Sequence, residues 1–381
     1  MAAAATLEAR ELAPARFGIG EFLIVGGATP LLLALSWLVR REIALSSAAL
    51  AVSATAFYAA YAINDPHFTV TYLLFYRNVR ARAFGGALSK TQRARYLVAG
   101  FVVPAILGAW GLVAIARDSW LAMGLLLQLM FLLVGWHYVK QGFGVMTVLA
   151  ARRGVRFSSI ERFVILAHCY AGWAYAWASP FDPGRPAEEK GVVYMTLAQP
   201  HGLERLTHVV FLATLAPLVY FLARKWVRER RLPIVTPLVA MLASVWVWSI
   251  YSSFDPLVVF VVPALHSIQY LYFVYLLRRN EAREREGPPH FDVSAKVRVG
   301  TLAVSAVALG VVLFHAGPTF LDDVFVNKRH ALEDPLGPTP FFAAIYAFVN
   351  VHHYFMDWVI WRRENPETRF LVDRTIDAGA R

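Results

Sequence analysis

Long apolar runs separated by short polar segments dominate the pattern of the chain. Ten of these runs are long enough to predict helices at membrane depth. They cover residues 22–38, 45–61, 96–115, 120–150, 163–177, 206–222, 232–250, 257–277, 299–314 and 341–361. A helix satisfies every backbone N–H and C=O group within its own segment, which is what crossing a bilayer requires. The pattern therefore predicts an all-α, polytopic integral membrane protein with a single transmembrane domain, residues 1–381.

A shorter apolar run, residues 67–75, follows the second of these long runs. Pro66 separates the two, and the short run continues into an arginine-rich segment. The run is too short to cross the hydrocarbon core in a simple helix, so we expect a broken or re-entrant helix here. Counting it as a crossing gives eleven transmembrane elements.

The basic residues test this count, because cytoplasmic loops are enriched in Lys and Arg. With eleven crossings, 28 of the 37 Lys and Arg residues fall in alternate loops, among them Arg40 and Arg41, and 8 fall on the other side. The asymmetry predicts residues 1–21 outside and the tail, residues 362–381, in the cytoplasm, as in a bacterial inner membrane. The longer outside loops are then residues 179–205 and 316–340.

Composition agrees with a membrane protein and excludes several functions. Hydrophobic residues make up 58% of the chain and charged residues 17%, whereas a soluble domain has about 25% charged residues. The net charge of +11 therefore reflects topology, and we expect no nucleic-acid partner. The single cysteine, Cys169, excludes a disulfide framework, a cysteine zinc site and a four-thiolate iron–sulfur cluster.

Four clusters of polar residues interrupt the apolar runs. Polar groups at bilayer depth are costly unless they are paired or bound, so they mark functional positions. With a rise of about 1.5 Å per residue, all four clusters fall between the midplane and the cytoplasmic side. The clusters are residues 64–67, 136–141, 266–270 and 350–357.

Histidine is the residue type that all four clusters share. Residues three or four apart lie on one face of a helix, so most of these histidines gain a polar neighbour. A histidine that binds a metal needs such a neighbour, because its second ring nitrogen usually donates to a carboxylate or amide. The sets are His137 with Lys140 and Gln141, His266 with Gln269 and Tyr270, and His353 with Asp357.

Together the clusters supply five imidazoles and two carboxylates, enough for one or two transition-metal ions. Nitrogen and oxygen ligands without thiolate suit non-haem iron best, while copper, zinc and manganese stay open. The predicted ligands are His67, His137, His266, His352, His353 and Asp357. The candidate catalytic residues are Asp65, Lys140, Tyr270 and Asp357, with Gln141 and Gln269 as orienting groups.

Simpler roles stay open for single members of these clusters. A histidine in a membrane can serve packing by hydrogen bonding across helices, and Asp65, directly before Pro66, suits a helix N-cap. His168 is a candidate sixth ligand. The remaining histidines, which we expect at an interface or in solvent, are His201, His208, His290, His315 and His330.

The histidine-rich spans resemble the integral-membrane non-haem iron oxygenases. This group includes fatty-acid desaturases and hydroxylases, alkane hydroxylases and bacterial carotene-cleaving dioxygenases. The resemblance covers four short segments that contain His67, His137, His266 and the pair His352-His353, and it does not include an H-x-x-x-H box. It implies an iron-dependent oxidation inside the membrane.

The predicted function is O2-dependent hydroxylation, desaturation or cleavage of a hydrophobic lipid or isoprenoid that arrives laterally from the bilayer. The chain has no dinucleotide fingerprint and no reductase domain, so a separate electron donor is expected. Two alternatives use the same residues. One is a proton-coupled transporter with an Asp/His relay, and the other is a membrane protein that binds haem through two histidines.

Overall fold

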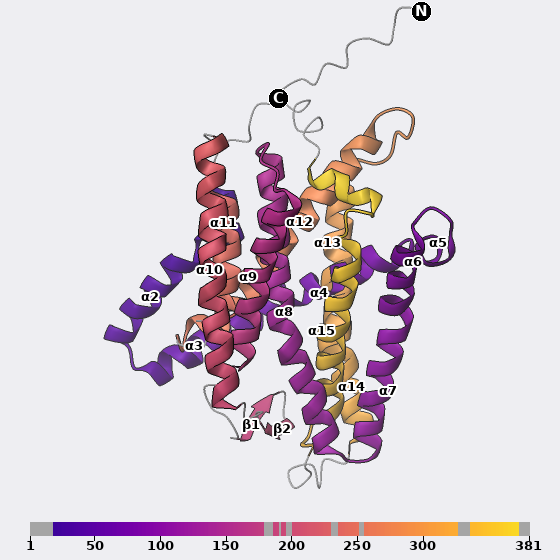
Figure 1. Ribbon diagram of the computed structural model, residues 1–381. Helices are drawn as coiled ribbons and strands as arrows, with labels where there is room; N and C mark the ends of the chain where they lie inside the picture. Colours follow the sequence, from indigo (N-terminus) through magenta and orange to yellow (C-terminus); the bar gives the residue numbers. More distant parts are fainter. Residues whose placement is uncertain are drawn as a thin grey trace, which may run out of the picture.

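The computed structural model describes residues 18–178, 200–229, 235–250, 255–326 and 336–372, and the backbone of residues 186–189 and 192–195. In this part of the chain the protein is a bundle of helices with one small β-hairpin at one end (Figure 1). The hairpin pairs β1 (Pro186–Glu189) with β2 (Val192–Met195) in antiparallel register, within the predicted outside loop 179–205.

The α-helices follow the predicted apolar runs closely. They are α1 (Ile19–Phe22), α2 (Thr29–Glu42), α3 (Leu45–Ala60), α4 (Asn64–Tyr76), α5 (Val79–Phe84), α6 (Lys90–Leu97), α7 (Val103–Ala116), α8 (Trp120–Arg152), α9 (Ser159–Ala178), α10 (His201–Glu229), α11 (Val235–Leu242), α12 (Val258–Glu286), α13 (Ala295–Val311), α14 (Gly317–Phe325) and α15 (Pro340–Ile360). Short π-helical segments continue several of them: η1 (Leu23–Gly27), η2 (Val98–Val102), η3 (Ala243–Trp248) and η5 (Val312–Ala316). A short 3₁₀-helix, η6 (Pro366–Leu371), follows α15.

Six helical segments in the described chain are long and apolar enough to cross a membrane. A seventh candidate is the pair formed by Ile19–Gly27 and Thr29–Glu42, which is bent by 67°. Gly26 lies at this bend with a φ of 137°, a conformation that favours glycine. Large apolar side chains such as Leu50 and Val304 lie exposed on the surface of the bundle, where lipid would cover them. The chain is thus an α-helical, polytopic membrane protein, as predicted.

The predicted eleventh crossing is not a separate one. Helices α3 and α4 form a single helical path, Leu45–Tyr76, of 32 residues. Backbone hydrogen bonds continue across the junction, from Ile63 N–H to Ala59 O and from His67 N–H to Ile63 O. Pro66 lies in the first turn of α4, where a missing N–H breaks no helical hydrogen bond. The break is therefore a local kink.

Many of the basic segments gather at one end of the bundle, which we call the basic end. Glu21 at the start of the described chain pairs with Arg153 at the end of α8 at 3.0 Å. Arg152 beside it donates to the carbonyl of Leu371, after α15. The two ends of the described chain therefore lie on the same side, whereas we predicted residues 1–21 and the tail on opposite sides (Figure 1).

The two ends lie on the same side because α3 and α4 form one continuous path through the bundle. The chain leaves the basic end through α2 and returns to it through α3 and α4, and Arg77 after α4 pairs with Glu281 near the end of α12 at 3.0 Å. Arg40 in α2 instead pairs with Asp255, just before the start of α12, at 3.3 Å. Arg40 thus lies well away from the basic end, whereas we predicted it on the same side as the other basic loops.

The start of α4 is buried in the bundle. Seven consecutive residues, Asp65–Thr71, are buried, so other helices cover this part of α4 on all sides. Helix α13 approaches α4 closely at Gly310, where an added Cβ would lie 3.0 Å from the Cβ of Asp65. Small residues allow helices in membranes to approach in this way. This packing places His67 among α8, α12 and α15.

Candidate metal centre

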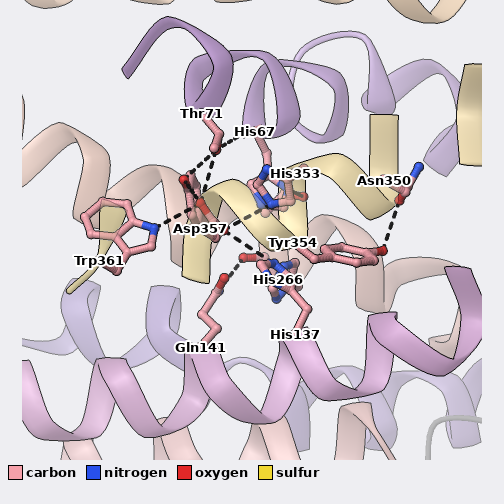
Figure 2. A network of polar contacts seen from close by, with 12 residues as sticks. His67, Thr71, His137, Gln141, His266, Asn350, His353, Tyr354, Asp357 and Trp361 are labelled. Carbon is pink, nitrogen blue, oxygen red and sulfur yellow. Dashed lines mark hydrogen bonds and ion pairs between the residues drawn. The ribbon is translucent and has the colours of Figure 1, made fainter. Parts of the chain in front are cut away.

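Four histidines and one aspartate from four helices converge inside the bundle (Figure 2). The side chains are buried, with 0% to 6% of each residue exposed. The ring centroid of His67 lies 4.5 Å from that of His353 and 5.0 Å from that of His266. The ring centroid of His137 lies 4.9 Å from that of His353 and 4.8 Å from that of His266. The helices α4, α8, α12 and α15 thus bring together His67, His137, His266, His353 and Asp357, which we call the His/Asp cluster.

Six ring nitrogens of the cluster lack hydrogen-bond partners within the described protein. These unpartnered buried atoms are Nε2 of His67, Nε2 of His137 and both ring nitrogens of His266 and His353. The Nε2 atoms of His353 and His137 lie 3.2 Å and 3.7 Å from Oδ2 of Asp357, in neither case with hydrogen-bond geometry. Such groups are rare in proteins, because a buried polar atom without a partner costs about 1–3 kcal/mol.

The tautomer of His67 follows from its one partner. The hydroxyl of Ser267 donates to Oδ1 of Asn64 at 2.7 Å and lies 2.9 Å from Nδ1 of His67. Since its only proton goes to Asn64, Ser267 accepts a hydrogen bond from Nδ1–H of His67. Nε2 of His67 then carries a free lone pair directed into the cluster, which is the form of imidazole that binds metals.

Asp357 presents its two oxygens to different neighbours. Oδ1 accepts hydrogen bonds from the hydroxyl of Tyr270 at 2.6 Å and from the indole N–H of Trp361 at 3.1 Å. The hydroxyl of Thr71 lies 2.5 Å from that of Tyr270 and 3.4 Å from Oδ1. Oδ2 faces His353 and His137 instead. One oxygen is held in place by donors while the other remains open toward the histidines.

The geometry fits a single metal ion. One ligand atom from each of His67, His137, His353 and Asp357 can be chosen so that all four lie within 4.8 Å of one another. Two ligands bound to one ion at about 2.1 Å are at most about 4.2 Å apart, so binding would need only a small contraction. His266 lies against this set with both nitrogens unpartnered. The described residues therefore offer one site with a fourth imidazole beside it.

The two predicted orienting glutamines join the helices around the cluster. The amide of Gln141 donates to the carbonyl of His266 at 3.1 Å and to Oε1 of Gln269 at 2.8 Å. Gln269 in turn donates to the carbonyl of Val25 at 2.6 Å. This chain connects α8, α12 and η1, and it fixes the backbone that carries His266.

Lys140 lies one helical turn from His137, toward the basic end. Its ammonium group lies 5.8 Å from the ring centroids of Phe143 and Tyr170. It lines a cavity of about 1290 Å³ that also reaches His137 and Asp357. Lys140 therefore borders the approach to the cluster.

His352 does not belong to the cluster, although we predicted it as a ligand. Its Nε2–H donates to the carbonyl of Ala99 at 2.9 Å, and its Nδ1 accepts from the hydroxyl of Tyr72 at 2.9 Å. Both ring nitrogens are therefore engaged on another face of α15. Consecutive residues on a helix point about 100° apart, so adjacent histidines rarely share one site.

Asp65 also lies outside the cluster. Its Oδ2 is 2.8 Å from Nε2 of His315, and the His315 ring stacks on Tyr61 with ring centroids 3.8 Å apart. We predicted Asp65 as a catalytic residue or ligand and His315 as an interface or solvent residue. The structure instead pairs the two between α4 and η5, so this part of the prediction is corrected.

His168, the candidate sixth ligand, has hydrogen-bond partners for both ring nitrogens outside the cluster. Nε2 accepts the indole N–H of Trp246 at 3.1 Å, and Nδ1 lies 2.9 Å from the hydroxyl of Thr214. His168 packs in a separate apolar group between α9 and α10, with its ring 4.9 Å from that of Phe211.

Besides Trp361, three residues of the site were not predicted from sequence. Thr71 and Ser267 supply hydroxyls around Asp357 and His67, and the ring of Tyr354 stacks on that of His137 at 4.7 Å. Thr71 lies one turn after His67 on α4, so helical spacing could have identified it. Ser267 and Tyr354 directly follow His266 and His353, and nothing in the sequence pattern reveals that they contact other helices.

The arrangement bears on the haem alternative. Haem bound through two histidines needs its macrocycle between them, whereas here four imidazoles lie in mutual contact with ring centroids 4.5 to 6.1 Å apart. The packed rings leave no space for a macrocycle between any two of them. Comparison with known proteins gives no further assignment, since no family model, curated protein or solved structure matches the chain.

Proposed function

We propose that the protein is a membrane-embedded, metal-dependent oxidoreductase that uses non-haem iron and O2 on a hydrophobic substrate. The observation that carries the proposal is the set of unpartnered ring nitrogens in the His/Asp cluster. Leaving these nitrogens without partners in an apolar interior is costly. A cation bound among them would satisfy the lone pairs together and neutralise the carboxylate.

The donor set favours iron among the common metals. Imidazole suits zinc, copper, iron and nickel, and a site of several histidines with one carboxylate and no thiolate matches non-haem iron. Cys169 is buried in another apolar group, with Phe211 and Ile165, so it offers no thiolate here. Iron would supply the ability to pass electrons to O2, with electrons from a separate donor.

The chain's own residues would hold and shield the metal. His67, His137 and His353 would bind through ring nitrogens, and Asp357 through Oδ2. Tyr270 and Trp361 keep Oδ1 of Asp357 in place by hydrogen bonds. Stacking of Tyr354 on His137 orients that ring and excludes water from one side. Such supporting contacts typically change metal affinity 10- to 100-fold.

Metal analysis of detergent-purified protein tests the proposal. We expect about one iron per chain, no Soret absorption, and loss of the iron in H353Q. The neighbouring H352Q is the matched control, since His352 lies on the same helix and its nitrogens are engaged elsewhere. H352Q should retain the metal.

Two results would overturn the proposal. Folded, anaerobically purified protein that binds no transition metal after incubation with Fe²⁺ would remove the metal site. The proton-coupled transporter would then be the better assignment, with Asp357 and the histidines as the relay. Equal iron content in H353Q and the parent protein would show that iron binds elsewhere.

A further inference from the structure

The cavity beside the His/Asp cluster extends from the cluster to the basic end of the bundle. Its volume is about 1290 Å³, and its lining includes buried His137 and Asp357 as well as Arg156 and Arg363, which are exposed. A substrate therefore has a path to the cluster from this end. We had expected access only laterally from the bilayer.

The inner part of the cavity is largely aromatic. Trp136, Tyr354, Trp358 and Trp361 line it within four residues of His137 or Asp357 in sequence. Aromatic and apolar walls favour an apolar ligand. This end of the cavity suits a hydrocarbon chain, next to the cluster where oxidation would occur.

The lining of the cavity carries an excess of positive charge. Five cationic side chains line it and form no ion pair with a carboxylate in the part of the chain that the structure describes. These residues are Lys140, Arg156, Arg162, Arg362 and Arg363.

The carboxylates that line the same region do not neutralise this charge, because each is already paired. Glu281 pairs with Arg77 and Arg278, while Glu284 pairs with Arg369. Glu364 and Glu367 face the cavity as well, and their partners are Arg95 and Arg82. The five cations are left available to an anion.

Topology explains basic residues at a cytoplasmic end, but it does not explain Lys140. This lysine lies inside α8, three residues from His137 and twelve before the end of the helix at Arg152. It is partly buried, and a lysine within a membrane span is costly without a partner or ligand. Lys140 thus extends the positive charge from the mouth of the cavity toward the cluster.

We propose that the cavity binds a single-chain amphiphile with an oxyanion head group, a carboxylate or a phosphate. The head would contact Lys140 and Arg362, and the apolar chain would lie against the aromatic wall. Asp357 lies in the last turn of α15 and Arg362 lies two residues past its end, so the cluster faces a position close to the head group. This inference rests on the proposed function for the reaction, but the binding itself does not require a metal.

Binding measured on metal-free protein tests the proposal separately from iron chemistry. H353Q in neutral phosphatidylcholine nanodiscs would be titrated with dodecanoate, dodecyl phosphate, dodecanol and dodecyltrimethylammonium. We expect the two anions to bind at least about tenfold more tightly than the alcohol, since a charge-assisted hydrogen bond contributes about 1.5–3 kcal/mol. Comparison of the two anions identifies the preferred head group.

Charge-removing variants locate the binding. K140Q and R362Q, each added to H353Q, should weaken anion binding about tenfold. R80Q is the control, because Arg80 is exposed at the basic end and does not line the cavity. Equal binding of alcohol and anions, or equal weakening by R80Q and K140Q, would overturn the proposal. Iron binding without selective anion binding would leave the proposed function standing and reject only the substrate class.

Discussion

At the scale of single residues, hydrogen bonding separates the histidines that face the cluster from those that do not. His352 and His353 are adjacent in α15 and both are buried, but only His353 keeps unpartnered nitrogens. His168 shows the same distinction, since Trp246 and Thr214 occupy its ring. Burial alone therefore does not distinguish a candidate ligand from a packing histidine, whereas the hydrogen bonds of the ring nitrogens do.

Tyr270 offers a test at this scale. Replacing it with phenylalanine removes the hydroxyl that donates to Oδ1 of Asp357 while it preserves the ring. We expect Y270F to lower metal affinity by roughly 10-fold or more, because supporting hydrogen bonds of this kind hold the ligand in place. Metal competition with a chelator measures the change. Y275F, on an exposed part of the same helix, should leave affinity unchanged, and a similar loss in both variants would contradict the assigned role.

The sequence revealed much of the site but not its boundary. Costly polar residues at a shared depth identified His67, His137, His266, His353 and Asp357. The same pattern also included Asp65 and His352, because depth does not specify which way a side chain points. Asp65 turned out to pair with His315, a contact between α4 and η5 that depends on how α13 packs. Such contacts between helices depend on the tertiary fold and leave no local pattern.

At the scale of elements, close packing of α13 on α4 keeps His67 in position. The prediction concerns Gly310 and Gly300, which both lie in α13. A Cβ at Gly310 would lie 3.0 Å from Cβ and 3.4 Å from the backbone carbon of Asp65, whereas nothing lies within 4 Å of a Cβ at Gly300. G310A should therefore lower the thermal midpoint and weaken metal binding.

G300A serves as the matched control for this prediction. It should be neutral or should stabilise the protein by about 0.5–1 kcal/mol, because alanine favours a helix over glycine. Thermal unfolding in detergent and metal titration would be run on both variants. Unchanged metal affinity in G310A would show that α4 is held by other contacts.

Asp255 provides a second test at this scale, through pH. It accepts hydrogen bonds from the N–H groups of Leu257 and Val258 before α12 and from the hydroxyl of Ser36. Burial acts to raise the pKa of Asp255, but these donors and Arg40 outweigh it and lower the pKa. Since the pKa is lower in the folded protein, the stabilisation is complete above the unfolded value of about 3.9 and is lost as pH falls through the folded pKa.

The comparison is between the parent protein and D255N. The parent should have the higher thermal midpoint near pH 6, and the difference should shrink as the pH falls below about 4. Asn keeps an acceptor oxygen for these N–H groups, so the difference between the two proteins reports the charge of Asp255. A difference that stays constant down to pH 3 would show that the charge of Asp255 does not contribute.

At the scale of the whole molecule, the structure predicts an arrangement of the ends that the sequence did not. Counting apolar runs treated residues 67–75 as a crossing, and this reversed the side assigned to the N-terminal segment. The run is apolar and follows a proline, so its continuity with α3 could not be read from the sequence. Contacts between distant segments, such as the ion pair of Glu21 with Arg153, place the start of the described chain at the same end of the bundle as the end of α8.

Single cysteines can test this arrangement, because the only native cysteine, Cys169, is buried and can be replaced by alanine. Cysteines at Gly20 and Gly86 would lie at the basic end, and one at Arg117 would lie beyond α7 at the other end. We expect an impermeant maleimide, added to sealed vesicles of known orientation, to label G20C and G86C from one side and R117C from the other. Labelling of G20C together with R117C would contradict the fold.

The spread of the cluster along the chain has a consequence for how the protein is made. Its residues run from His67 in α4 to Asp357 in α15, the final long helix of the described chain. A ribosome that has released only the first fourteen helices has produced three of the histidines but neither His353 nor the carboxylate. Metal acquisition would therefore follow membrane insertion of the last helix, and the metal content of a preparation would report the fraction of chains that completed biogenesis.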